Sequence, residues 1–575
     1  MAANGAGFDF LAFRAQQSKQ NEHILAETGH AETAIAAREL AKKTTKAPSS
    51  AKPKAPREKK TTAPRKRKAD AIADGAADEG ALRRSSRRSQ PMRAVNSQTE
   101  QERADIERRN REEAERQKAE EQRAKHAPRP VEANEGGTRD ALGQGPLDEE
   151  FRRLALYDPA AHTEEEDEWE MGTRPPLGTV DQNEFANDLE LRAIVKVIPE
   201  RIYSMVVHPD PTRDLVFAGD KAGYISLWDC TDAGQPMPAT EPKAVKSPVV
   251  GDDGEEGEDE TEAEVEMNHG KWWNWKAHRT NSVSWLKFRP GQPGSLYSSA
   301  YDGTLRVTHF ETGISEEVIN GEHWAEDTLI HSFDFDPTGN QLWASDNDGG
   351  LIWRDLRQPM TKAKRWEIDR YKVGCISINQ ANPDLAATAH LKRYMALWDL
   401  TKLRGMSEDA KPDDIVMEAQ IVSCEHEKAC SSAYFDPTGT RLASTSYDDS
   451  IRVWDIDASN LRSLKKAYST APFSPVKRIP HNCQVGRYVT VLRAHWSTVP
   501  SLPPHLHIGS MDRSVDLYSP DGNSIARMYD ADWITAVPAV TACHPTRPDR
   551  YYGGSASGKI SFWSKPLETT EEAEE

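Results

Sequence analysis

The chain lacks the residue patterns that mark metal binding and catalysis. Its 17 histidines include no HExxH spacing, and its six cysteines include no CxxC pair, which argues against a metal site and a redox pair. No G-x-S-x-G, phosphate-binding loop or paired-carboxylate motif is present either. We therefore expect no catalytic residues, no cofactor and no metal, and cysteines that are buried thiols in a reducing compartment.

Long apolar segments are also missing. No uninterrupted apolar run approaches the ~18 residues of a membrane span, and the N-terminal sequence has no apolar signal-peptide core. We expect a soluble, intracellular protein that does not enter membranes.

A repeated β-pattern fills the C-terminal two-thirds of the 575 residues. Its clearest copies are 223–229 (GYISLWD), 394–399 (YMALWD) and 450–455 (SIRVWD). Weaker copies end near positions 308, 354, 518 and 563, and neighbouring copies are 44 to 80 residues apart. A base period near 45 residues is that of WD-repeat propellers. The sequence predicts an all-β, seven-bladed WD-repeat β-propeller over 187–564, which binds rather than catalyses and which we expect to be monomeric.

The last repeat stops at its third strand, so its blade needs a fourth strand from elsewhere. The apolar segment 191–198 precedes the first repeat and is the simplest source, since it would close the ring without a free edge. The long intervals predict insertions after Asp229 (the acidic segment 232–270) and after Asp455, on the face opposite the blade-to-blade loops.

The charge is distributed unevenly around a net value of −18. Residues 41–93 hold 17 Lys and Arg against 5 Asp and Glu, whereas 164–170, 252–266 and 568–575 are acidic runs without Lys or Arg. We predict a mostly disordered, basic N-terminal extension over 1–186, with a solvated charged helix at 99–126, and an acidic tail at 565–575. A mildly acidic propeller must meet an anionic partner through a local patch or through the basic tail.

Two compact cationic runs lie in this tail, and their residues are Arg65, Lys66, Arg67, Lys68, Arg83, Arg84, Arg87 and Arg88. Such runs suit recognition by nuclear import receptors. They also suit phosphate contact that does not depend on base sequence. Import alone, import with nucleic-acid contact, and a basic linker without either role remain open.

The propeller face that carries the blade-to-blade loops is a second candidate. Its expected polar and basic residues are Arg201, Lys221, Arg279, Arg370, Lys372, Lys392, Arg393, His481, Asn482, Arg487 and Tyr488. Convergent positive side chains would suit a phosphate backbone, and Arg487 with Tyr488 could meet an unstacked base. The alternatives are surface charge without a patch and ordinary loop variation. The Trp-rich segment 271–276 is expected to pack between strands, and His278 and His426 match the histidine that bonds within a WD repeat.

Several segments resemble the DNA damage-binding WD-repeat family. They are 195–209 (VKVIPERIYSMVVHP) with 217–221 (FAGDK), 299–306 (SAYDGTLR), 346–350 (DNDGG), and His481-Asn482 with Gly486-Arg487. The resemblance spans the whole propeller. It implies a nuclear protein that binds single- and double-stranded DNA, prefers ultraviolet-damaged DNA, and acts in DNA metabolism after damage or replication stress. Where a related propeller carries a lesion wedge, this chain has Gly486-Arg487-Tyr488, which does not match that wedge.

A protein-interaction scaffold is the alternative function. Substrate receptors of cullin-RING ubiquitin ligases often end a repeat in W-D-x-R, and residues 354–357 (RDLR) are a degenerate version with Asp355 and Arg357 as the docking candidates. The acidic loops would suit histones or other basic chromatin proteins.

Overall fold

The computed structural model describes residues 127–131, 147–159 and, with short gaps, 188–235, 267–457 and 459–566, besides isolated positions between 108 and 117 and Ala186. The basic runs at 65–68 and 83–88, the acidic runs at 164–170 and 252–266, and the tail from 567 lie outside these residues. Within the predicted charged helix, the described positions are helical and exposed.

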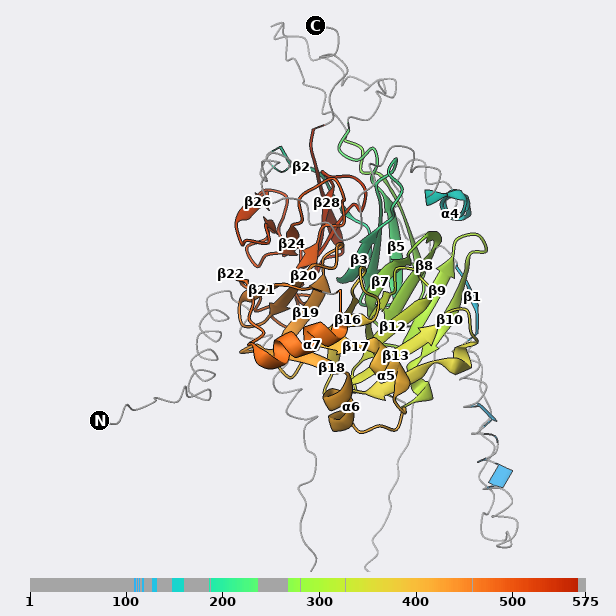
Figure 1. Ribbon diagram of the computed structural model, residues 1–575. Coiled ribbons are helices and arrows are strands. Elements are labelled where there is room, and N and C mark those ends of the chain that lie inside the picture. The colour runs from blue at the N-terminus through green and yellow to red at the C-terminus, as the bar shows by residue number, and fades with distance from the viewer. Residues whose placement is uncertain are drawn as a thin grey trace, which may run out of the picture. The chain divides into compact units, whose positions relative to one another are not determined.

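Seven antiparallel sheets are arranged as the blades of a propeller, which confirms the predicted fold (Figure 1). Blade one consists of β3 (Ile202–Val207), β4 (Leu215–Asp220), β5 (Tyr224–Asp229) and β6 (Lys271–Lys276). Blade two consists of β7 (Val283–Arg289), β8 (Gln292–Ala300), β9 (Thr304–His309) and β10 (Ile314–Asn320). Blade three consists of β11 (Ile330–Phe335), β12 (Gln341–Asp346), β13 (Gly350–Asp355) and β14 (Lys364–Glu367).

Blades four to six continue the same order along the chain. Blade four consists of β15 (Val373–Ile378), β16 (Leu385–His390), β17 (Tyr394–Asp399) and β18 (Gln420–Glu425). Blade five consists of β19 (Cys430–Phe435), β20 (Arg441–Ser446), β21 (Ser450–Asp455) and β22 (Lys477–Pro480). Blade six consists of β23 (His495–Trp496), β24 (Leu506–Gly509), β25 (Val515–Tyr518) and β26 (Ser524–Met528). In each of the first six blades the four strands of the repeat follow chain order, and each strand pairs antiparallel with the next one along the chain.

Blade seven combines the two ends of the propeller. Its strands β27 (Val540–Cys543), β28 (Tyr551–Gly554) and β29 (Lys559–Ser564) are completed by β2 (Glu190–Lys196), which pairs with β29 from Glu190↔Ser564 to Lys196↔Lys559. The predicted closure of the ring by the segment before the first repeat is therefore confirmed. Pairing at this position leaves no bare strand edge at the junction.

The repeat signature lies where expected, on the third strand of each blade. Trp228, Trp398 and Trp454 are at most 1% exposed, so the apolar pattern that predicted the strands also fills the spaces between sheets. The insertion after Asp455 contains α7 (Leu461–Thr470). A further insertion after β17, which we did not locate, contains α5 (Leu400–Gly405) and α6 (Pro412–Ala419).

The blade-to-blade loops and the turns between second and third strands share one side, here called the loop face. Hydrogen bonds join them directly: Lys221 N donates to Arg201 O at 3.0 Å and Leu391 N donates to Lys372 O at 3.1 Å. Helices α5, α6 and α7 connect third to fourth strands and so lie on the opposite side, which is nearer the viewer in Figure 1.

The residues before the propeller contribute two elements that the sequence analysis did not locate. The strand β1 (Arg129–Pro130) extends the second blade beyond β10. The helix α4 (Leu147–Leu156) inserts Phe151 between Trp275 and Phe310, at centroid distances of 5.4 and 5.0 Å. Trp273 and Trp275 are 8% and 0% exposed, which confirms that the Trp-rich segment packs between elements.

Candidate nucleic-acid interface

The repeat histidines have structural roles. His278 Nδ1 lies 3.1 Å from Asp302, and His426 Nδ1 lies 3.1 Å from Asp448. The second ring nitrogen of each lies near a serine of the same blade, at 2.9 and 3.0 Å. These contacts confirm the predicted bonding within the repeat. No group of three potential metal ligands occurs among the described residues, and no described helix has the length and apolar character of a membrane span.

His481 belongs to the same structural set, which corrects its prediction as a DNA contact. It is 6% exposed, and its Nε2 and Nδ1 lie 3.0 Å from Gly509 O and 3.3 Å from the Tyr518 hydroxyl. The position before the blade-six strands is thus the repeat-histidine position. A side chain enclosed in this way is not available to a ligand.

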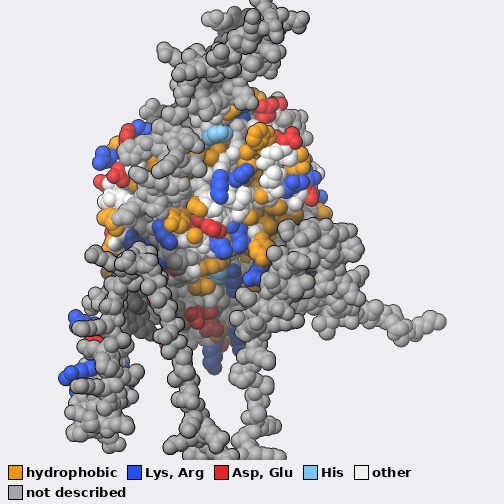
Figure 2. Space-filling model, turned by 180° about the vertical axis from the view of Figure 1, so that it is seen from behind, with side chains coloured by type: hydrophobic (Ala, Val, Ile, Leu, Met, Phe, Trp, Pro, Cys, Tyr) orange, Lys and Arg blue, Asp and Glu red, His pale blue; other side chains and the backbone are white. Residues whose placement is uncertain are grey.

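Most of the other loop-face candidates reach solvent. The exposed ones are Lys221, Arg279, Arg370, Lys392, Arg393, Asn482, Arg487 and Tyr488. Lys392 Nζ stands 5.8 Å from the ring centroid of Tyr371, so a cation and a ring are presented together. Figure 2, which shows the side away from α5, α6 and α7, has Lys and Arg side chains among hydrophobic ones near the middle of the described surface.

Exposed aromatic residues accompany these cations, and the sequence analysis missed most of them. Tyr488 is 77% exposed, Trp533 63% and Tyr371 52%. All three lie on blade-to-blade loops. Large rings left in water at a basic surface are the side chains on which unstacked bases pack. A sequence signal was available, because Trp533 follows the fourth strand of blade six in a segment that also holds Asp530, Asp532 and Thr535.

The loop 481–494 reaches across the ring to blade one. Arg201 donates from Nη1 to Arg487 O at 3.2 Å, and the Thr490 hydroxyl donates to Ile202 O at 2.7 Å. Blade seven lies between blades six and one, so this loop bypasses it and lies across the mouth of the central channel. Arg201 also stands 5.0 Å from the Tyr203 ring centroid. The structure therefore brings together Arg201, Arg487 and Tyr488, which the sequence analysis proposed from separate segments.

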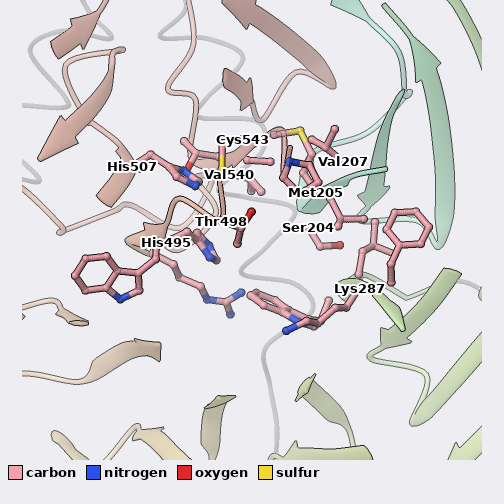
Figure 3. Close-up of a pocket in the computed structure, with 18 of the residues that line it drawn as sticks. Ser204, Met205, Val207, Lys287, His495, Thr498, His507, Val540 and Cys543 are labelled. Carbon is pink, nitrogen blue, oxygen red and sulfur yellow. The ribbon is translucent and has the colours of Figure 1, made fainter. Parts of the chain in front are cut away.

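An aromatic stack crosses the channel below this loop. The rings of Trp285 (β7) and Tyr434 (β19) are 5.7 Å apart, and His495 (β23) stacks on Tyr434 at 4.8 Å. Arg493, two residues before His495, places its guanidinium 5.3 Å from the Trp285 ring centroid. A cavity of ≈ 330 Å³ lies beside the stack, and Figure 3 shows Met205, Lys287, His495 and His507 among the residues that line it.

Lys372 lies near Arg493 at the loop-face end of the channel. Its Nζ is 5.9 Å from the Tyr301 ring centroid. Burial and the positive charge of Arg493 lower the pKa of Lys372 to about 8. Arg493 was missed at the sequence level, although the apolar residues Leu492, Ala494 and Trp496 alternate with Arg493 and His495, a period of two that marks an extended segment with one polar face.

The proposed docking pair lies on the opposite face. Arg357 forms two hydrogen bonds to Asp355, at 2.9 and 2.7 Å, and is 64% exposed. These bonds lower the pKa of Asp355 to about 2. Since the third strands end on the side away from the loop face, this pair does not contribute to the basic surface.

Comparison with known proteins supports the repeat assignment and extends over the propeller. Residues 419–455 match the family described as "WD domain, G-beta repeat". A protein of Cryptococcus neoformans named DNA damage-binding protein CMR1 is 33% identical over 429 residues, or 66% of this chain and 70% of the relative. A protein of Mycosarcoma maydis with the same name is 30% identical over 544 residues, or 76% and 83%. One from Neurospora crassa is 32% identical over 371 residues, or 64% and 65%. This identity, over a propeller whose loop face gathers cations and rings, shows that the chain belongs to the family of the DNA damage-binding proteins CMR1.

Proposed function

We propose that this protein binds DNA, with preference for damaged DNA, and that the loop face of the propeller is its contact surface. The observation that carries this proposal is the meeting of Arg201, Arg487 and Tyr488 at the channel mouth, among further exposed cations and rings. The family name DNA damage-binding protein supports the choice of ligand.

The chemistry of this surface matches a distorted nucleic acid better than a regular duplex. Lys and Arg side chains neutralise phosphates regardless of sequence. Exposed rings gain stacking energy only where a base has left its stack, worth ~1–3 kcal/mol per base. Damage that unstacks a base would therefore add a favourable contact to a phosphate contact that is already present. The protein acts by binding, and we assign no bond-making step to it.

Charge reversal at the channel mouth tests the proposal. We expect Arg487→Glu in the full chain to weaken binding to an irradiated duplex by ~10-fold or more, because it replaces attraction to phosphate with repulsion. Fluorescence anisotropy at two salt concentrations would measure the affinity and its salt dependence. Arg462→Glu, at an exposed position of α7 on the opposite face, is the matched control.

Equal affinity of Arg487→Glu and the wild type, with the same salt dependence, would remove the loop face from the DNA contact. Binding would then fall to the basic tail. A wild type that binds irradiated and intact duplexes equally would reject the preference for damage while keeping DNA as the ligand.

Nuclear localisation is part of the proposal and depends on the basic tail. The two cationic runs, 65–68 and 83–88, have the composition that import receptors read. Their roles in import and in additional phosphate contact stay predictions.

Protein partners are compatible with DNA binding because of the geometry. Asp355 and Arg357 lie on the face opposite the loop face, so an adaptor of a cullin-RING ligase could dock while DNA is bound. Arg357 already bonds its own Asp355, and a partner would have to meet the pair as a unit. Docking of an adaptor, and of histones on the acidic segments, stays a prediction.

A further inference from the structure

Two half-buried cations at the loop-face end of the channel have no anionic partner. Arg493 and Lys372 form no side-chain hydrogen bond or ion pair within the part of the chain that the structure describes. The Nε of Arg493 is buried and unsatisfied, as are those of Arg354 and Arg452, but these two arginines donate from another nitrogen to a carbonyl or a carboxylate. A buried donor without an acceptor costs ~1–3 kcal/mol, and more where it is charged.

Other buried arginines of this propeller show what such a group usually finds. Arg365 and Arg452 bond Asp346 and Asp448, at 2.6 and 2.9 Å. Arg306, 1% exposed, has no carboxylate but donates to the Ser315 carbonyl at 2.8 Å. Arg493 has neither kind of acceptor. Arg493 therefore differs from these structural arginines, because no carboxylate or carbonyl oxygen of the described residues accepts a hydrogen bond from its side chain.

Rings surround the two cations instead. Arg493 lies over Trp285, and Lys372 lies near Tyr301. Tyr301 contacts His331 at 4.8 Å and Tyr203 at 6.5 Å. Burial and the charges of Lys372 and Arg493 keep the pKa of His331 well below its usual range, so this imidazole is neutral at pH 7. No Asp or Glu is among the groups that shift the pKa of Lys372 or His331.

The charges of Arg493 and Lys372 repel each other and are partly removed from water, and both effects destabilise the site unless other interactions offset them. Ring faces supply part of this compensation, ~0.5–2 kcal/mol for each cation. A bound anion would supply the rest, because charge-assisted hydrogen bonds strengthen where water is excluded. The site is thus organised for an anion before one arrives.

We propose that Arg493 and Lys372 bind a phosphate group at the channel mouth, and that this group belongs to the DNA strand held on the loop face. A phosphate oxygen pair matches the planar fork of an arginine, and Lys adds a point charge. The inference deepens the proposed function by naming an inner phosphate site beside the outer residues Arg201 and Arg487. A small phosphate ester has the same chemistry and is the alternative source.

The test uses the full chain with Arg493→Gln and Lys372→Gln, which remove charge while keeping polarity and approximate size. Arg462→Gln and Lys362→Gln, on the opposite face, are matched controls. A fluorescent oligonucleotide is titrated at several salt concentrations, and the unfolding temperature is followed with added pyrophosphate or with chloride at equal ionic strength. We expect each inner variant to weaken DNA binding ~10-fold or more, and to lower the salt slope by about 0.9.

Pyrophosphate should raise the unfolding temperature of the wild type and of both controls, but not of the Arg493 variant. If the inner variants bind DNA with wild-type affinity and slope, the inner site is rejected and the proposed function stands on the outer residues. If no protein binds DNA while pyrophosphate still stabilises through Arg493, the site binds a small phosphate and the proposed function fails. If neither ligand binds, both are rejected. Should Arg493→Gln not fold, Lys372→Gln decides alone.

Discussion

Single residues on the loop face differ in how they hold their charge. Arg487 is exposed and meets water, whereas Lys372 is half-buried and has a pKa of about 8. An anion bound beside this ammonium favours its charged form and raises its pKa. Proton binding and phosphate binding at Lys372 are therefore linked.

We expect DNA affinity to fall between pH 7.5 and 9.5, because the free Lys372 loses its proton through this range and the bound one keeps it. Binding near pH 8.5 should take up a fraction of a proton. Titration calorimetry in two buffers of different ionisation enthalpy measures this uptake. Lys372→Gln serves as the control, since its DNA affinity should not change with pH over the same range. If this variant takes up as much of a proton on binding DNA as the wild type does, the proton binds at another residue.

At the scale of elements, α4 docks on the propeller through the buried side chains of Leu147, Phe151 and Leu154. Phe151 is 2% exposed and touches Trp275 and Phe310. An ion pair between Glu150 and Arg213 at 2.5 Å adds a polar contact. A helix of ten residues is marginal by itself in water, so its order depends on this docking.

We expect Phe151→Ala to detach α4 while leaving the blades folded, because removing a buried phenyl ring costs ~3–5 kcal/mol and the sheets do not need the helix for their own hydrogen bonds. Hydrogen exchange should show loss of protection across 147–156 with unchanged protection in β4 and β8. Leu156→Ala, at a position that is 83% exposed, should leave exchange unaltered. Persistent protection of α4 in the Phe151 variant would contradict this account of docking.

The elements that could be predicted are those whose information is local. Every third strand carries its repeat signature and its alternating apolar positions, so the blades and the closing strand followed from the sequence. The helix α4 was missed because only Leu147, Phe151 and Leu154 mark its buried face, within a stretch rich in Gly and Pro.

The candidate site was less predictable, since it depends on contacts between distant residues. His481 was misplaced because the long loop after it obscured its position in the repeat. Arg493 was missed because its neighbours Trp285 and Lys372 lie on other blades, and sequence spacing does not reveal which side chains meet across a channel.

At the scale of the whole molecule, many buried histidines tie stability to pH. Burial lowers the pKa of His208, His426 and His505 to about 4, and that of His495 to about 3. In the unfolded chain, the pKa of each of these histidines is ~6.5. The unfolded state therefore binds more protons below this pH, and the stabilisation present above pH 6.5 is lost as pH falls toward 4.

We expect the free energy of unfolding to decrease below pH 6.5 by ~1.4 kcal/mol per pH unit for each such histidine. Urea unfolding at pH 7.5, 6 and 5 would measure the slope. His495→Phe keeps a ring against Trp285 and Tyr434 but cannot be protonated. The free energy of unfolding of this variant should therefore fall less steeply with decreasing pH, by the contribution of one histidine, ~1.4 kcal/mol per pH unit. A slope that is the same in wild type and variant would mean that His495 titrates normally.

The pairing of β2 with β29 also has a consequence for biosynthesis. The ribosome makes β2 before any complete blade, and this strand must wait until β29 emerges, more than 360 residues later. Until then the nascent chain presents Val195 and its neighbours to chaperones, and blade seven stays open. A chain cut short before residue 559 would keep six complete sheets, while β2 would lack the strand with which it pairs.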